Sequence, residues 1–259
     1  MKPMRSRLLF SAALLALVSA PALAQTPAPS APAASKGISQ SAMSLLKQMS
    51  ETIGGAQAFT FHADILSDHV LPSGQKLQFA AGEDVALKRP GALYVEWSGD
   101  LGDRQFWYDG SKVTLFDPAT PFYATASAPP TIDAMLTDLL PKAGFVPPLS
   151  DLLYADPFGA LGARIKYAVD LGSGDVRGKS CRVLAFVEKD IDWQIWIAPG
   201  DKPTPCKLVI TYKTQPSQPQ FSATFTSWDF SPTLTPAVFS AAPPPGLKQI
   251  PFAGREAAK

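Results

Sequence analysis

Residues 192–212 carry the strongest structural signal in this 259-residue chain. Trp193, Ile195 and Ile197 occupy every second position, which is the periodicity of a strand with one buried face. A loop rich in proline follows, and residues 206–212 then alternate in the same way. The stretch predicts an antiparallel hairpin with a stiff loop, and it contains no obvious catalytic group.

Runs with the same alternation fill most of the chain after residue 57. Turn residues separate them, among them Asp109-Gly110, a strong hairpin signal, and Gly172-Ser173-Gly174. The predicted strands are 58–65, 76–88, 92–98, 104–108, 112–116, 122–125, 163–171, 181–189, 192–197, 206–213 and 220–230. Roughly ten strands predict a mainly β (α+β) fold, a curved and partly closed antiparallel sheet whose concave face is filled by a helix or a ligand.

Three segments have the three- and four-residue spacing of amphipathic helices. The first, 38–53, ends at Gly54-Gly55, and the other two are 131–142 and 149–154. We expect Asp156-Pro157 to end the last of them. The two later helices interrupt the sheet, so they either cap the open side of the curved sheet or pack on its outside.

The first 24 residues have the pattern of a cleavable secretory signal peptide. Lys2, Arg5 and Arg7 precede an apolar run, and Ala22-Leu23-Ala24 supplies the small residues of a cleavage site. The apolar run, residues 8–18, is shorter than the ~20 residues of a spanning helix. We therefore expect export, a mature chain that begins at residue 25, and no transmembrane segment in it.

The remainder divides into a tether and one domain. Residues 25–37 are rich in proline, alanine and serine and contain too few large apolar groups to join a core. Residues 38–259 are long enough for a single β domain. Without the signal peptide the chain has 20 basic and 22 acidic residues, a net charge of −2, which does not suit a nucleic-acid partner.

Cys181 and Cys206 are the only cysteines, and export places them in an oxidising compartment. Each opens a predicted strand, and one strand lies between them, so their separation is ~9–10 Å in a regular meander. A disulfide requires Cα atoms within ~7 Å, so one cysteine must lie in a loop and swing across. We expect the disulfide, with two buried free thiols as the alternative.

The inventory of catalytic groups is thin. His62 and His69 are the only histidines, and no ligand spacing typical of a metal site accompanies them. Glu83 and Asp84 are adjacent, so a strand sends them to opposite faces, and we interpret both as surface charges. Asp100, Asp103 and Arg104 are assigned to a loop. We expect no catalytic site, no metal and no cofactor.

Aromatic residues are the better signal. Many lie in predicted strands, either as an ordinary β core or as the lining of a concave face that holds a lipid-like ligand, and both interpretations stay open.

Five segments together resemble a known family. They are ALKRPGALYVEWSGD (86–100), FWYDGSKVTLFDP (106–118), TIDAML (131–136), PLSDLLYADP (148–157) and DWQIWIAPGDKPTPCKLVITYK (192–213). Their order and spacing are similar to a family of predicted bacterial periplasmic proteins of unknown function. That family is in turn similar to the LolA/LolB-like outer-membrane lipoprotein carriers. The likeness covers residues 38–252.

The resemblance implies an incomplete antiparallel half-barrel of about eleven strands closed by short helices, located in the periplasm. Its interior is then expected to accept acyl chains. The candidate cavity residues are Leu93, Val95, Trp97, Phe106, Leu136, Leu140, Trp193, Ile195 and Phe225. The sequence departs from the family where Cys206 replaces a usual basic residue and where Val183 replaces a common histidine. The carriers also rely on a cavity arginine, which the sequence does not identify here.

Two functions follow as hypotheses. The first is a periplasmic binding or carrier protein for a lipid, an acylated molecule or another hydrophobic ligand. The second is a non-catalytic envelope interaction or stress-sensing domain that holds no lipid and has envelope proteins as partners.

Overall fold

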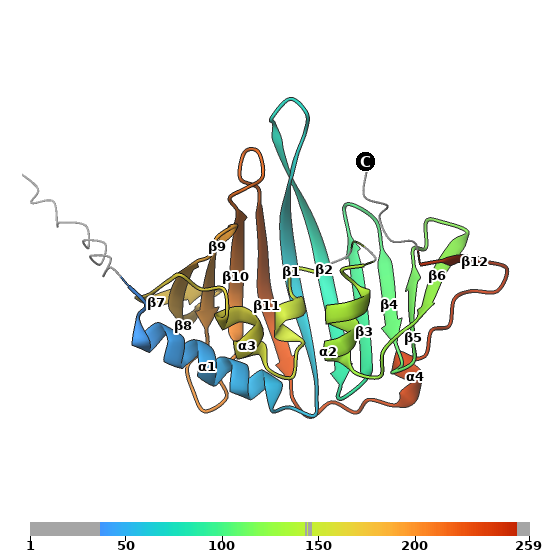
Figure 1. Cartoon of the computed structure of the whole chain (residues 1–259), viewed down its shortest axis with the longest axis horizontal. Coiled ribbons are helices and arrows are strands. Elements are labelled where there is room, and N and C mark those ends of the chain that lie inside the picture. Colours follow the sequence, from blue (N-terminus) through green and yellow to red (C-terminus); the bar gives the residue numbers. More distant parts are fainter. Residues whose placement is uncertain (1–36, 143, 145–146, 253–259) are drawn as a thin grey trace, which may run out of the picture. The chain divides into compact units, whose positions relative to one another are not determined.

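The computed structural model describes residues 37–142, 144 and 147–252. The predicted signal peptide (1–24) and all but the last residue of the predicted tether (25–37) lie outside these residues. Twelve strands form one sheet in the order β12-β6-β5-β4-β3-β2-β1-β11-β10-β9-β8-β7 (Figure 1). The terminal strands of this order, β12 and β7, do not pair with each other among the described strands, so the sheet is open. The predicted mainly β, incomplete half-barrel is confirmed.

The strands follow the predicted meander closely. All pairs are antiparallel except β12 with β6, which is parallel. Their bounds are β1 Ala58–Val70, β2 Lys76–Lys88, β3 Ala92–Gly99, β4 Arg104–Tyr108, β5 Lys112–Phe116, β6 Phe122–Ser127, β7 Tyr167–Val176, β8 Lys179–Val187, β9 Ile191–Ile197, β10 Pro205–Tyr212, β11 Gln220–Asp229 and β12 Lys248–Pro251. The sequence analysis missed β12, which lies in the proline-rich tail.

The helices lie on one face of the sheet, which we call the inner face (Figure 1). They are α1 (Gln40–Gly54), α2 (Ile132–Ala134) with a π-helical continuation Met135–Leu139, a 3-10 turn Ser150–Leu152, and α3 (Pro157–Gly162). A short α4 (Pro236–Phe239) contacts β3. The predicted helices therefore cover the inner face. No helix in the described part of the chain is long and apolar enough to span a membrane.

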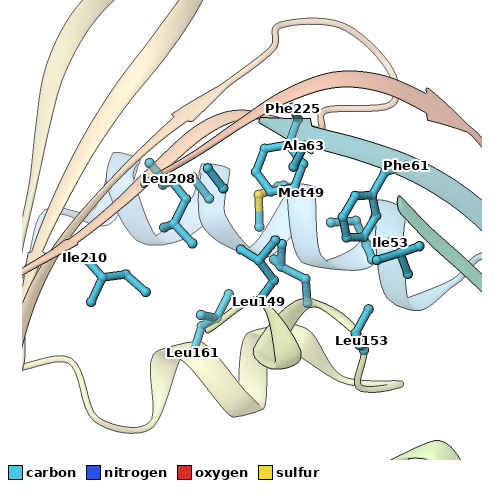
Figure 2. Close-up of a cluster of buried hydrophobic side chains, with 14 of the residues drawn as sticks. Met49, Ile53, Phe61, Ala63, Leu149, Leu153, Leu161, Leu208, Ile210 and Phe225 are labelled. Atoms are coloured by element: carbon cyan, nitrogen blue, oxygen red, sulfur yellow. The ribbon is translucent and has the colours of Figure 1, made fainter. Parts of the chain in front are cut away.

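The core forms where α1 meets the sheet. Met49 and Ile53 of α1 point toward strand residues such as Phe61 and Phe225, and Leu153 closes the cluster from below (Figure 2). All of these side chains are buried. Burial of each large apolar side chain contributes roughly 1.5–3 kcal/mol, so this cluster stabilises the fold substantially. Ser39 caps α1 by accepting a hydrogen bond from the backbone N–H of Ala42.

Two local predictions were wrong. The turn expected at Gly172-Ser173-Gly174 lies inside β7, where the register shifts between Asp170 and Gly172, and Gly172 has a φ of +89°. Such a shift is a β-bulge, which a glycine in this conformation accommodates. The actual turn is Arg177-Gly178, whose φ values of +54° and +80° match a tight hairpin turn. Asp156-Pro157 also begins the unpredicted α3, because Asp156 Oδ1 accepts a hydrogen bond from Gly159 N.

The segment between β6 and β7, residues 128–166, carries α2, the 3-10 turn and α3, and we call it the helical insert. Arg89, in the β2–β3 turn, holds this insert to the sheet. Its guanidinium donates hydrogen bonds to three backbone carbonyls, those of Ala56 (3.2 Å), Leu153 (3.0 Å) and Tyr154 (2.8 Å). The next carbonyl, that of Pro90, accepts a hydrogen bond from Ile132 N at 2.8 Å. The planar fork of an arginine can reach three such acceptors at once.

We predict that Arg89→Met lowers the free energy of unfolding by about 2–4 kcal/mol, because three carbonyls lose charge-assisted hydrogen bonds. Urea denaturation followed by far-UV circular dichroism measures the change. Arg177→Met is the control, since among the described residues Arg177 pairs with exposed Asp64 alone, and its expected cost is under about 1 kcal/mol. Equal losses in the two variants would contradict the role given to Arg89.

A disulfide joins Cys181 of β8 to Cys206 of β10, with the Cα atoms 7.0 Å apart. The pairing register of β10 with β9 shifts between Pro205 and Lys207, so Cys206 occupies a bulge. This irregularity brings Cys206 toward β8 although β9 lies between them. The predicted disulfide is present, and a bulge takes the place of the loop expected at one cysteine.

We predict that replacing both cysteines, Cys181→Ala with Cys206→Ala, destabilises the fold by about 2–4 kcal/mol. The cross-link spans 25 residues, and a closed loop of that length removes roughly this much entropy from the unfolded chain. Guanidinium unfolding of the variant, compared with oxidised wild type, measures the loss, and reduced wild type should be destabilised by a similar amount. A variant as stable as the oxidised wild type would show that the disulfide contributes nothing to stability.

Candidate functional site

A cavity of about 240 Å³ lies between the inner face of β2–β5 and the helical insert. Its walls are mostly apolar, and among the described lining residues the polar groups are those of Glu83, Arg104 and Ser150 and the indole nitrogen of Trp97. The lining residues are Glu83, Leu93, Val95, Trp97, Arg104, Phe106, Leu115, Leu136, Leu140, Pro147, Pro148, Leu149, Ser150 and Leu153. An apolar hollow with few polar groups is the usual form of a site for a hydrophobic ligand, and this volume is somewhat below the roughly 300–1,000 Å³ of typical ligand pockets.

The floor of the cavity is built from transverse rows of cross-strand neighbours. One row runs from Val85 of β2 through Val95 and Phe106 to Leu115 of β5. Side chains at every second strand position share a face, so these apolar residues all point inward. The register of three consecutive antiparallel strand pairs therefore creates the apolar floor.

The next row along the same strands is polar. It places Glu83 of β2 beside Trp97 of β3 and Trp97 beside Arg104 of β4. On the other side Glu83 faces Ala63 of β1. We call Glu83, Trp97 and Arg104 the polar row; it marks one boundary of the apolar cavity.

Glu83 is buried, with 7% of its surface exposed, and its carboxyl has no hydrogen bond or ion pair with the described residues. Removal of water from the carboxyl, reinforced by the negative charge of Asp84, raises the pKa of Glu83 to about 7. The indole Nε1 of Trp97 is also buried and has no hydrogen-bond partner in the described part of the chain. Buried polar groups are normally paired, so two neighbouring exceptions need an explanation.

The interpretation of Glu83 and Asp84 as surface charges was wrong for Glu83. Only Asp84 lies on the outer face, where its Oδ1 is 2.8 Å from Nδ1 of His62. Glu83 continues the inward series of Val85 and Leu87, whose alternation already gave the phase of this strand. Arg104 is the first residue of β4, which confirms the predicted strand 104–108 and not the loop assignment, and it lines the cavity.

Six of the nine predicted cavity residues line this cavity: Leu93, Val95, Trp97, Phe106, Leu136 and Leu140. The other three lie elsewhere on the inner face. Phe225 packs into the core, with its ring 5.4 Å from those of Phe61 and Trp228. Trp193 and Ile195 border a void of only about 30 Å³. Binding of a ligand by any of these residues remains a prediction.

The region around Trp193 is closed by its own side chains. Trp193 Nε1 donates a hydrogen bond of 2.8 Å to the buried carboxylate of Glu188, and its ring stacks on Phe186 at 4.1 Å. Arg164 Nε donates to the other oxygen of Glu188 at 3.0 Å, and its Nη2 reaches Asp151 at 2.9 Å. These polar groups satisfy one another, in contrast to the polar row.

Two other kinds of site, a metal centre and a second pocket, were considered among the described residues. Within the described ranges no three His, Cys, Asp or Glu residues lie close enough together to hold a metal ion. A larger depression of about 710 Å³ lies beside the end of α1, but polar residues such as Gln48, Glu51 and Lys202 border it and it is open to solvent. The 240 Å³ cavity is the better candidate site because it is apolar and more enclosed.

The chain belongs to a family described as predicted periplasmic proteins, DUF2092, whose model matches residues 42–253. This confirms the resemblance found in the sequence and the periplasmic localisation. A search of curated proteins found no match.

Solved structures with a similar course of the chain have low identity. Lipoprotein LppX from Mycobacterium tuberculosis is 12% identical, with 75% of this chain and 97% of that chain covered and a TM-score of 0.48. For LprF from Mycobacterium bovis the identity is 14%, the coverage 76% and 97%, and the TM-score 0.46. A LolA superfamily protein from Nitrosomonas europaea is 11% identical, with 77% and 97% covered and a TM-score of 0.39. At these values the likeness says nothing about function.

We predict that Glu83→Gln changes how stability depends on pH. Between pH 4.5 and about 7 the folded chain retains the Glu83 proton while the unfolded chain loses it. Wild-type stability therefore falls through this window, and Glu83→Gln lacks that contribution. The variant should gain about 3 kcal/mol over wild type from pH 4.5 to pH 8, since one pKa unit is about 1.4 kcal/mol.

Urea unfolding of both proteins at the two pH values tests this. Glu96→Gln on the outer face is the matched control. A difference for Glu83→Gln that does not change with pH would show that the carboxyl is not buried in its neutral form.

Proposed function

We propose that this protein binds a lipid, an acylated molecule or another hydrophobic ligand in the cavity between β2–β5 and the helical insert, as a periplasmic binding or carrier protein. The observation that carries the proposal is the apolar floor formed by Val95, Phe106 and Leu115, which faces the apolar insert across unfilled space. A fold that needed only a core would gain by filling this space, because voids forfeit packing contacts. The family resemblance found in the sequence points the same way.

No catalytic step is part of the proposal. The ionisable side chains that line the cavity are Glu83 and Arg104. Neither has a described partner of the kind that activates a nucleophile. Their position at one boundary of an apolar hollow suits recognition of a ligand.

The second candidate is an envelope interaction or stress-sensing domain without a bound lipid. One observation favours it: under the 3-10 turn and α3 the inner face is packed nearly shut, with Trp193 and Ile195 beside a void of only about 30 Å³. If the remaining cavity closes as well in solution, the protein's partners are other envelope proteins.

Mass spectrometry of organic extracts distinguishes the two candidates. The protein is purified from a bacterial periplasm without detergent, beside a control periplasmic protein. The proposal expects a lipid or acylated species in stoichiometric amount. An empty protein that also fails to take up added lipid favours the second candidate.

We predict that Val95→Phe reduces the bound lipid by about tenfold, because the larger ring occupies the cavity and overfilling a packed site costs about 1–3 kcal/mol. The same extraction, normalised to protein, measures it. Val209→Phe is the matched control, since Val209 lies half-buried outside the cavity on β10. Unchanged lipid in Val95→Phe, with the variant folded, would place the ligand elsewhere.

A further inference from the structure

The polar row has a feature that lipid binding alone does not require. Its two buried members, the carboxyl of Glu83 and the indole N–H of Trp97, lie on directly paired residues of β2 and β3 and have no partners among the described residues. Leucine or phenylalanine at these positions would serve an apolar ligand better. A buried indole N–H without a partner, on the residue paired with a carboxyl that lines the cavity and has no described partner, indicates a ligand that supplies both hydrogen bonds.

The chemistry of the two groups narrows the choice of ligand. The indole N–H only donates, so the ligand must offer an acceptor atom to Trp97. The carboxyl of Glu83 accepts a hydrogen bond in either protonation state, so the ligand should also offer a donor. A hydroxyl group has both capacities on one oxygen, whereas an ether or a methyl group does not.

The charges around the row argue against an ionic head group. Glu83 itself and Asp84, its neighbour on the outer face, oppose a negative group placed beside the carboxyl. Arg104, the exposed cation at the end of the row, opposes a positive one. Among the described residues Arg104 has no ion pair, so its charge is not cancelled by another side chain. An ionic head group of either sign would be attracted by one of these two charges and repelled by the other, whereas an uncharged hydroxyl can pair with the carboxyl and the indole without either repulsion.

We infer, on the basis of the proposed function, that the cavity selects lipids whose polar group is an uncharged hydroxyl, such as a fatty alcohol or a partial acylglycerol. The carboxyl of Glu83 accepts a hydrogen bond from the hydroxyl group, and Trp97 Nε1 donates a hydrogen bond to the hydroxyl oxygen. The hydrocarbon chain lies on the floor formed by Val95, Phe106 and Leu115. Ser150, on the insert, is the further hydroxyl that borders this space.

The test compares four probes with the same ten-carbon chain, a length suited to a small cavity: 1-decanol, decyl methyl ether, decanoate and decylammonium. Isothermal titration calorimetry of the delipidated full chain at pH 7.5 gives the affinities. We expect 1-decanol to bind at least about fivefold more tightly than each of the others, since one hydrogen bond contributes roughly that factor.

Variants assign the preference to the polar row. Glu83→Leu should lower the affinity for 1-decanol by about five- to tenfold, to the affinity measured for decyl methyl ether, and should not lower the affinity for decanoate. Glu83→Gln, which retains an acceptor, should keep most of the preference. Trp97→Phe should lower the affinity for both 1-decanol and decyl methyl ether, because the oxygen of each probe accepts a hydrogen bond from the indole N–H. Glu96→Leu, on the outer face, is the matched control and should leave every affinity unchanged.

The outcomes separate the two proposals. Decanoate that binds as tightly as 1-decanol, or a 1-decanol affinity that is the same in Glu83→Leu and wild type, would overturn the selectivity and leave the hydrophobic site in place. If none of the four probes binds wild type and no lipid copurifies, both proposals are overturned. Removal of a buried unpaired carboxyl should not harm folding, and Glu83→Gln provides a second readout if Glu83→Leu proves insoluble.

Discussion

The covering of the inner face is the constraint on which this structure depends. An open sheet of twelve strands has one apolar face too large to leave in water, and two separate parts of the chain cover it. Helix α1 packs tightly over one region, where Met49 and Ile53 meet Phe61 and Phe225 (Figure 2). The insert between β6 and β7 covers β2–β5 less completely. The cavity is the space left by this second cover, and Arg89 helps to keep the insert in place.

Two buried carboxyl groups of the structure, Glu188 just after β8 and Glu83 in β2, have opposite surroundings. Glu188 is paired with Trp193 and Arg164, so its charge is compensated and the region around it is filled. Glu83 lies at nearly the same degree of burial without such partners, and its pKa rises to about 7 as a result. A buried carboxylate whose charge is met by partners within the fold, as that of Glu188 is, serves the structure itself. A buried carboxyl without compensation is destabilising, and selection tolerates this most readily at sites that bind something.

Much of the fold could be predicted from periodicity. The alternation of Trp193, Ile195 and Ile197 gave both the strand and its buried face, and the helical spacing gave α1 within a residue or two of its ends. Glycine turns were less certain, since Gly172 could open a turn or accommodate a bulge and only the pairing of β7 with β8 decides. The short insert helices were displaced or missed because one or two turns of helix carry little periodic signal.

The sequence by itself determined the fold class, the apolar face of most strands and six of the residues that line the cavity, because hydrophobic period and strand geometry are local properties. It did not determine that Glu83 is buried, that Arg104 borders the cavity or that Trp193 belongs to the filled region. These facts depend on which strands become neighbours, in what register, and on how completely two distant segments cover them. Tertiary structure decided them, because a carboxyl is buried or solvated according to what packs over it, and that cover comes from residues far away in the chain.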